Sequence, residues 1–205
     1  REAWAGRLLA PVYARAAPRL SARPRRLLQP IAPLNQGPTI LLVTRSLRVE
    51  GRLWLEVLLP VRPNGTRGWV PADVMRLRRV ATRIVIDLGD RRLSLYRAGR
   101  RVMRVPVAVG KPGTPTPTGR LFAIAEVIRT NIPGAFLGPV VFPLTGYSER
   151  LNEFAGGDGR VAIHGTSLPS LIGTRASNGC IRMRNGDVLR MARLVRPGTP
   201  VAIRP

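Results

Sequence analysis

The chain has 205 residues, and its 44% hydrophobic content is ordinary for a globular protein, so this length accommodates one large domain or two small ones. It has 34 Lys and Arg against 11 Asp and Glu, a net charge of +23 that suits nucleic acid, anionic lipid or anionic wall polymers alike, or reflects solvated surface arginine. The single cysteine excludes an intrachain disulfide, and no apolar run reaches the roughly 18 residues typical of a membrane-spanning helix.

Residues 1–36 mix arginine with repeated proline, as in APRLSARPRRLLQPIAP. Proline lacks a backbone donor and interrupts helices, so this segment is predicted to be an extended lead-in or linker. No signal-peptide pattern is visible at its start, so any export signal is expected to lie outside this sequence.

Residues 37–80 contain short apolar runs, TILLV, LWLEVLLP and GWV, separated by glycine and proline. This pattern predicts a small β domain. The stretch WLEVLLPVRPNGTRGWVPADVM resembles bacterial SH3-like domains, which implies a small barrel. Trp54 and Trp69 are then candidates either for stacking on glycan or for filling the core.

Residues 81–205 begin with apolar positions that alternate, which predicts successive strands. Near the end, DVLRMARLV has helical spacing and predicts a short helix with Asn185 or Asp187 as its cap, followed by the closing strand PGTPVAI. The whole chain is therefore predicted to be mainly β. The alternating positions are Ile84, Ile86 and Leu88, then Leu93 and Leu95, then Val105, Val107 and Val109.

The sole histidine and the sole cysteine lie 16 positions apart, as His164 and Cys180. His164 ends the apolar run VAI, and Cys180 sits in SNGCIR, so a strand is expected to present the imidazole and a loop the thiol. A neighbouring imidazole activates a thiol as a nucleophile. Gly179 leaves room beside the thiol, and the N–H groups of Gly179 and Cys180 are candidate oxyanion donors.

The pattern His-Gly, a spacer, then S-x-G-C-x-R resembles the L,D-transpeptidase (YkuD-like) catalytic domain, whose spacer is about 14 to 17 residues. The resemblance spans about Thr82 to Ile203 and includes the TPTPTG turn. It implies a β-rich domain over 81–205 that acts as a cysteine acyltransferase and cross-links peptidoglycan stem peptides through a thioester. An extracytoplasmic location, in the cell wall or envelope, follows from that substrate.

Carried over to this sequence, the resemblance makes Cys180 the nucleophile and His164 its general base. The carbonyl of Gly165 would orient the imidazole, a role that a carboxylate has in other triads. Gly179 and Cys180 would supply the oxyanion donors.

Four further residues complete the predicted site. Ser177 would shape the turn, and Arg182 would hold either a substrate carboxylate or a structural partner. Asn178 stands where the family usually has histidine, so any proton transfer through that second imidazole is in doubt. Tyr147 belongs to the Gly- and Pro-rich segment 130–154, which is a candidate lid or a packed loop, and it is a candidate substrate contact.

Other classes of function fit less well. A zinc site requires about three or four protein ligands, and one histidine with one cysteine leaves too few, so no metal or cofactor is expected. No nucleic-acid-binding motif is visible, so the expected partners are donor and acceptor stem peptides and, through the charge, anionic wall polymers. A non-catalytic wall-binding protein remains an alternative if Cys180 is buried or its pocket is closed. If water resolves the thioester, the same site is a carboxypeptidase, and the sequence does not decide between the two reactions.

Overall fold

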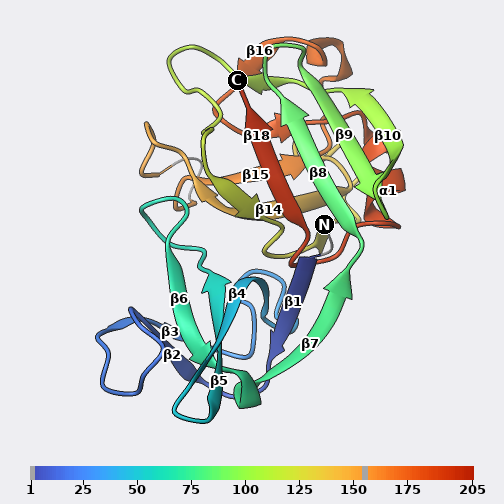
Figure 1. Cartoon of the computed structure of the whole chain (residues 1–205). Coiled ribbons are helices and arrows are strands. Elements are labelled where there is room, and N and C mark those ends of the chain that lie inside the picture. Colours follow the sequence, from blue (N-terminus) through green and yellow to red (C-terminus); the bar gives the residue numbers. More distant parts are fainter. Residues whose placement is uncertain (1–2, 154–156) are drawn as a thin grey trace.

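The computed structural model of the chain describes residues 3–153 and 157–205 and is mainly β, as predicted. Figure 1 shows two modules, an N-terminal module of residues 3–80 and a C-terminal module of residues 81–205, with β7 leading directly into β8. Among the described residues, no helix has the length and apolar character needed to span a membrane.

The N-terminal module is one seven-stranded sheet with the order β3-β2-β6-β5-β4-β1-β7. A short 3-10 helix, η1 (Ala72–Val74), precedes its last strand. Its strands are β1 (Ala3–Leu8), β2 (Val12–Arg15), β3 (Pro24–Leu28), β4 (Ile40–Val49), β5 (Arg52–Leu58), β6 (Arg67–Pro71) and β7 (Met75–Val80).

The described part of the segment predicted as a lead-in, residues 3–36, instead contributes three strands to this sheet. β1 pairs with both β4 and β7, and its Ala5 and Leu8 are buried. The prediction was wrong because the prolines do not interrupt the ladder: Pro24 starts the edge strand β3, where a missing backbone donor is tolerated.

The predicted closed barrel is not found. β3 and β7 are the end strands of the sheet, and no pairing between them is present among the described residues. Trp54 and Trp69 are 2% and 7% exposed, so they fill the core of this module. The SH3-like resemblance therefore stays a prediction.

The C-terminal module has a five-stranded sheet, β10-β9-β8-β18-β12, and a four-stranded sheet, β13-β14-β15-β17. The predicted apolar positions are buried in the core shared by these elements, which confirms the alternating pattern. The strands are β8 (Thr82–Asp87), β9 (Arg92–Arg97), β10 (Arg100–Pro106), β11 (Val109–Gly110), β12 (Leu121–Ala123), β13 (Ile128–Arg129), β14 (Val140–Tyr147), β15 (Arg160–His164), β16 (Arg175–Ser177), β17 (Ile181–Arg182) and the closing strand β18 (Pro200–Arg204), with the 3-10 helix η2 at Pro169–Leu171.

The predicted helix is α1 (Asn185–Ala192), and it buries Val188 and Met191. Its capping was predicted wrongly, because the helix begins after Arg184 without a side-chain cap. The side chain of Asn185 instead accepts a hydrogen bond from the Thr166 N–H at 2.8 Å. The start of α1 therefore holds the loop that follows the end of β15.

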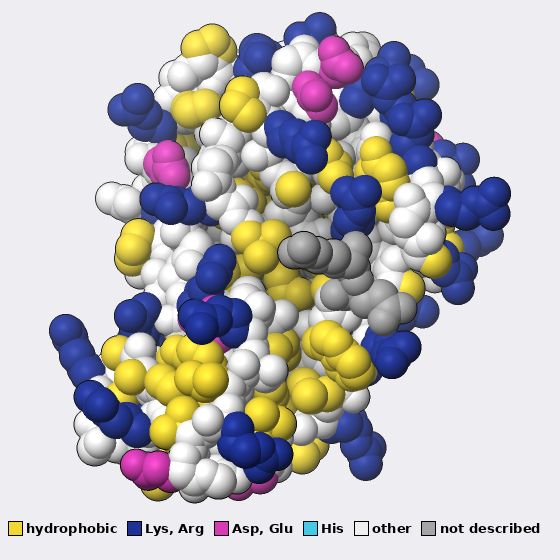
Figure 2. Space-filling view, in the orientation of Figure 1, with side chains coloured by type: hydrophobic (Ala, Val, Ile, Leu, Met, Phe, Trp, Pro, Cys, Tyr) yellow, Lys and Arg dark blue, Asp and Glu magenta, His cyan; other side chains and the backbone are white. Residues whose placement is uncertain are grey.

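Figure 2 shows Lys and Arg side chains spread over both modules on the visible face, with hydrophobic side chains around the boundary between them. Leu42 and Leu58 of the N-terminal module share a small buried cluster with Ala123 of the C-terminal module. The two modules therefore meet through an apolar contact, and the positive charge is distributed rather than confined to one spot on this face.

Candidate active site

The structure brings His164 and Cys180 to one pocket. β15 ends at His164, and the parallel strand β17 begins one residue after Cys180, with Ile163 opposite Ile181. Because side chains alternate along a strand, His164 and Cys180 lie on the same face. Both line a cavity of about 360 Å³. Within the described residues, no hydrogen bond joins the thiol to the imidazole.

The imidazole of His164 is held in one tautomer. The ring is 2% exposed, and Nδ1 lies 2.6 Å from the Gly165 carbonyl oxygen. A carbonyl only accepts, so Nδ1 carries the proton and Nε2 is left as the acceptor. A Cβ on Gly165 would lie 3.0 Å from the Cα of Gly138 and would overlap the Asn185 side chain, which explains why glycine follows the histidine.

Burial lowers the pKa of His164 to about 4; the Gly165 carbonyl opposes this shift, nearby Arg182 adds to it, and the Leu137 backbone opposes it. Burial likewise raises the pKa of the Cys180 thiol, while the Ala162 backbone and Arg182 oppose that rise. At neutral pH the resting pair is therefore a neutral thiol beside a neutral imidazole, and the thiol needs a base before it can attack.

We expect this buried histidine to make the fold sensitive to acid. The folded pKa of about 4 lies below the reference value of 6.5, so the unfolded chain takes up the proton first as the pH falls. The free energy of unfolding therefore falls as the pH drops from 6.5 to 4, by about 3 kcal/mol at pH 4 relative to neutral pH. Urea unfolding of the wild type and of His164→Gln at pH 7 and pH 4 measures this, and equal pH dependence in the two proteins would contradict it.

The loop before Cys180 is closed by Ser177. Its buried hydroxyl donates to the Cys180 carbonyl at 2.5 Å and accepts the Gly179 N–H at 3.1 Å. The predicted turn-shaping role fits these bonds. The expectation that the Gly179 N–H serves as an oxyanion donor is not met, because that N–H is already engaged. Gly179 has a φ of +111°, a conformation in which a side chain would be strained.

The proline-rich turn cradles this loop. The Thr116 hydroxyl donates to the Gly179 carbonyl at 2.9 Å and accepts the Gly110 N–H at 2.9 Å. The Thr114 hydroxyl lies 3.3 Å from Oδ1 of Asn178. The sequence pointed to this turn only as a resemblance. Alternating threonines in TPTPTG were the signal for these contacts, but their partners in the Cys180 loop, Asn178 and Gly179, are 64 and 63 positions away in the chain.

Replacing Thr116 by Val should destabilise the loop. The change leaves the Gly179 carbonyl and the Gly110 N–H without their partner in a buried position, at a cost of about 1–3 kcal/mol. The partly buried Thr118 is the matched control, because no hydrogen bond of its side chain is present among the described residues. In chemical unfolding, Thr116→Val should have a lower free energy of unfolding than Thr118→Val. Equal values would show that the hydrogen bonds of Thr116 do not stabilise the loop.

Arg182 also faces the Cys180 pocket. Its side chain is 8% exposed, its Cζ lies 5.0 Å from the centre of the Phe136 ring, and it lines the same cavity. Its buried Nε has no hydrogen-bond partner, and no carboxylate is paired with it in the described part of the chain. A buried cation in this state favours an incoming anion.

Tyr147 does not reach this pocket. Its hydroxyl donates to the Pro60 carbonyl at 2.8 Å and accepts from Nη2 of Arg160 at 2.7 Å. Tyr147 therefore joins the two modules outside the Cys180 pocket, and its predicted contact with substrate stays a prediction. Of the segment 130–154, Phe136 and Leu137 line the Cys180 pocket, while Phe154 lies outside the described residues.

Comparison with known proteins agrees with this geometry. Residues 81–203 match the YkuD family, described as the L,D-transpeptidase catalytic domain. The chain belongs to the L,D-transpeptidase family. It is 38% identical over 167 residues to a putative L,D-transpeptidase YkuD of Bacillus licheniformis, covering 78% of this chain and 92% of the relative. The YkuD protein of Bacillus subtilis is 38% identical over 176 residues, covering 83% and 96%.

A solved structure shares the fold. L,D-transpeptidase 3 from Mycobacterium tuberculosis, in complex with a faropenem-derived adduct, is 15% identical, with a TM-score of 0.50 over 80% of this chain and 98% of that one. The predicted activity is confirmed at the level of the family: this L,D-transpeptidase is an acyltransferase that cross-links peptidoglycan. The roles of individual residues remain predictions.

Proposed function

We propose that this L,D-transpeptidase forms a thioester on Cys180 and transfers the acyl group to an amine of a second stem peptide. The observation that carries the proposal is the shared cavity of about 360 Å³ that both His164 and Cys180 line, with the Gly165 carbonyl holding Nδ1 and leaving Nε2 as the base. Cys180 lines this cavity, which disfavours a purely structural cysteine.

In the first step, Nε2 of His164 takes the thiol proton as the sulfur attacks the peptide carbonyl carbon of the donor stem. A C–S bond forms and the C–N bond breaks. The proton on His164 passes to the departing nitrogen, and a D-amino acid leaves with its own carboxylate. The N–H of Cys180 remains the oxyanion donor of the predicted pair, because that of Gly179 is engaged.

In the second step, an acceptor amine attacks the thioester carbon and loses a proton to His164. A C–N bond forms, the C–S bond breaks, and the thiolate recovers the proton. Water in place of the amine gives a carboxypeptidase. We assign transfer as the main reaction on the basis of the family, and the largely apolar lining of the pocket, which includes Phe136, Leu137 and Ala162, offers a water molecule few polar partners.

Arg182 is proposed to bind a carboxylate of the donor stem. Its buried guanidinium lines the cavity beside Cys180, and the described residues supply it with no acidic partner. Asn178 lines the same cavity and, without a titrating ring, is proposed to contribute hydrogen bonds only.

The location and the wider partners follow from this chemistry. We propose an extracytoplasmic enzyme of the cell wall or envelope, because its substrate lies there. The net charge of +23 favours retention on anionic wall polymers. The proposed SH3-like character of the N-terminal module would fit a wall contact, although its two predicted stacking residues, Trp54 and Trp69, are buried.

The test is the course of the reaction with a tetrapeptide stem. Intact-protein mass spectrometry should detect a tripeptide adduct on Cys180, and added acceptor stems should convert it to cross-linked dimers. Tripeptide alone, even with excess acceptor, would overturn transfer in favour of hydrolysis. A protein that gains no mass from donor stems or from a carbapenem would overturn the nucleophile itself.

A further inference from the structure

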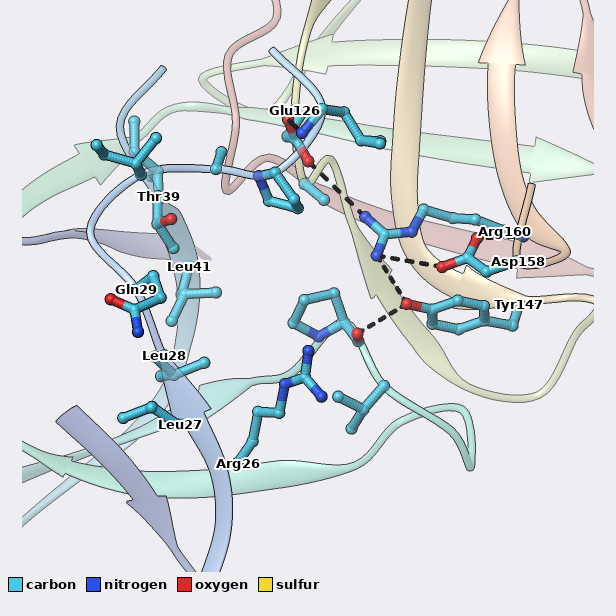
Figure 3. Close-up of a pocket in the computed structure, with 18 of the residues that line it drawn as sticks. Arg26, Leu27, Leu28, Gln29, Thr39, Leu41, Glu126, Tyr147, Asp158 and Arg160 are labelled. Carbon is cyan, nitrogen blue, oxygen red and sulfur yellow. Dashed lines mark hydrogen bonds and ion pairs between the residues drawn. The ribbon is translucent and has the colours of Figure 1, made fainter. Parts of the chain in front are cut away.

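A second cavity lies between the two modules. It measures about 680 Å³, within the usual range for ligand sites, and both modules contribute to its lining. Figure 3 shows Leu27, Leu28 and Leu41 of the N-terminal module on one side, facing Arg160 and Tyr147 of the C-terminal module on the other. Nothing in the activity described so far uses this space.

Hydrogen bonds between the two modules fix the width of the cavity. The buried carboxylate of Glu126 accepts the N–H of Leu34 at 3.0 Å and that of Asn35 at 2.8 Å. On the other side, Arg62 donates to the carbonyls of Ser148 and Leu151 at 2.6 and 3.0 Å. The cavity is therefore preformed, as ligand sites usually are.

This cavity adjoins the Cys180 pocket, because Leu34, Asp158 and Arg160 line both. Leu34 comes from the N-terminal module, which therefore supplies part of the wall of the catalytic pocket. A peptide lying in the cavity between the modules would reach the thioester past these three residues.

The charges of the cavity suit a peptide that carries carboxylates and an amine. Arg26 is exposed, has no ion pair or hydrogen bond of its side chain among the described residues, and extends toward the space between the walls in Figure 3. Arg160 is largely buried, and its Nε has no hydrogen-bond partner within the described chain. At the junction, Oδ1 of Asp158 accepts the Arg160 backbone N–H at 3.2 Å, and Oδ2 lies 3.8 Å from Nη2 of Arg160. The Asp158 side chain is 61% exposed, so its carboxylate can still meet a cation from solvent.

We propose that the cavity between the modules is the acceptor subsite, where an acceptor stem peptide binds with its carboxylates toward Arg26 and Arg160 and its amine toward Asp158. The apolar wall would cover apolar side chains of the stem. This proposal rests on the proposed transfer reaction, and it gives the N-terminal module a part in choosing the acceptor. The donor stem would occupy the Cys180 pocket beside Arg182.

The test separates the two half-reactions. Arg26→Gln and Asp158→Asn should each raise the KM for acceptor stems about tenfold, the effect of losing one charged hydrogen bond. Arg26 lines the cavity between the modules and not the Cys180 pocket, so Arg26→Gln should leave the rate of Cys180 acylation by donor unchanged. Arg23→Gln and Asp90→Asn are matched controls: Arg23 is exposed in the same segment, and Asp90 is 65% exposed in a surface ion pair. Both controls should behave as wild type.

Three results would overturn the proposal. An unchanged acceptor KM in both variants would show that acceptors bind elsewhere. Slower acylation by the donor, with no separate effect on the acceptor, would place the donor in this cavity. Absence of acylation in the wild type would instead overturn the proposed transfer reaction, and this subsite with it.

Discussion

Cys180→Ala should abolish covalent capture of donor stems and reduce turnover by about 10⁶-fold, the scale seen when a catalytic nucleophile is removed. No other group can take its place as a thiol, because the chain contains one cysteine. The Ser177 hydroxyl bonds the backbone carbonyl of Cys180 and not its thiol, so the backbone of the site should survive the substitution. Intact-protein mass spectrometry after exposure to a tetrapeptide stem or a carbapenem measures the effect.

The control measures whether Cys180→Ala still binds the donor stem although it cannot react with it. Cys180→Ala should retain its affinity for the donor stem, since Arg182 and the apolar lining of the pocket are untouched. It should also unfold at nearly the wild-type urea concentration. An adduct that persists in Cys180→Ala would locate the nucleophile elsewhere and end the thioester proposal.

His164→Ala should slow the acylation of Cys180 by about 10²–10⁴-fold, the usual contribution of a positioned general base. Burial raises the pKa of the thiol, so little thiolate exists at neutral pH without this base. Stopped-flow or timed mass spectrometry with a carbapenem gives the rate.

The pH profile distinguishes a base from a merely structural residue. In the wild type, His164 is protonated only below its pKa of about 4, so the acylation rate should stay level from pH 7 to about pH 5 and fall below that. In His164→Ala the rate should instead rise steadily with pH, following direct ionisation of the thiol. The same profile in both proteins, or an unchanged rate at pH 7, would remove His164 from the mechanism.

Much of the C-terminal module could be predicted from the sequence because its signals are local. Ile84, Ile86 and Leu93 alternate on strands that bury one face, and the apolar spacing of α1 buries Val188 and Met191. Hydrophobic period and spacing are properties of neighbouring residues, so they can be read from the sequence without knowledge of the fold. The N-terminal strands were missed because proline was taken as a general breaker, whereas an edge strand tolerates it.

The sequence by itself determined the chemistry of this protein. One thiol and one imidazole, in the settings SNGCIR and VAIHG, single out Cys180 and His164 as the candidate nucleophile and base, and the pattern around them identifies the family. Only the tertiary structure decided which partners those groups meet. The Gly179 N–H turned out to bind Ser177, and Tyr147 turned out to join the modules. Contacts such as that between Glu126 and Leu34 span 92 positions, and no local pattern encodes them, because they form only when the two modules pack against each other.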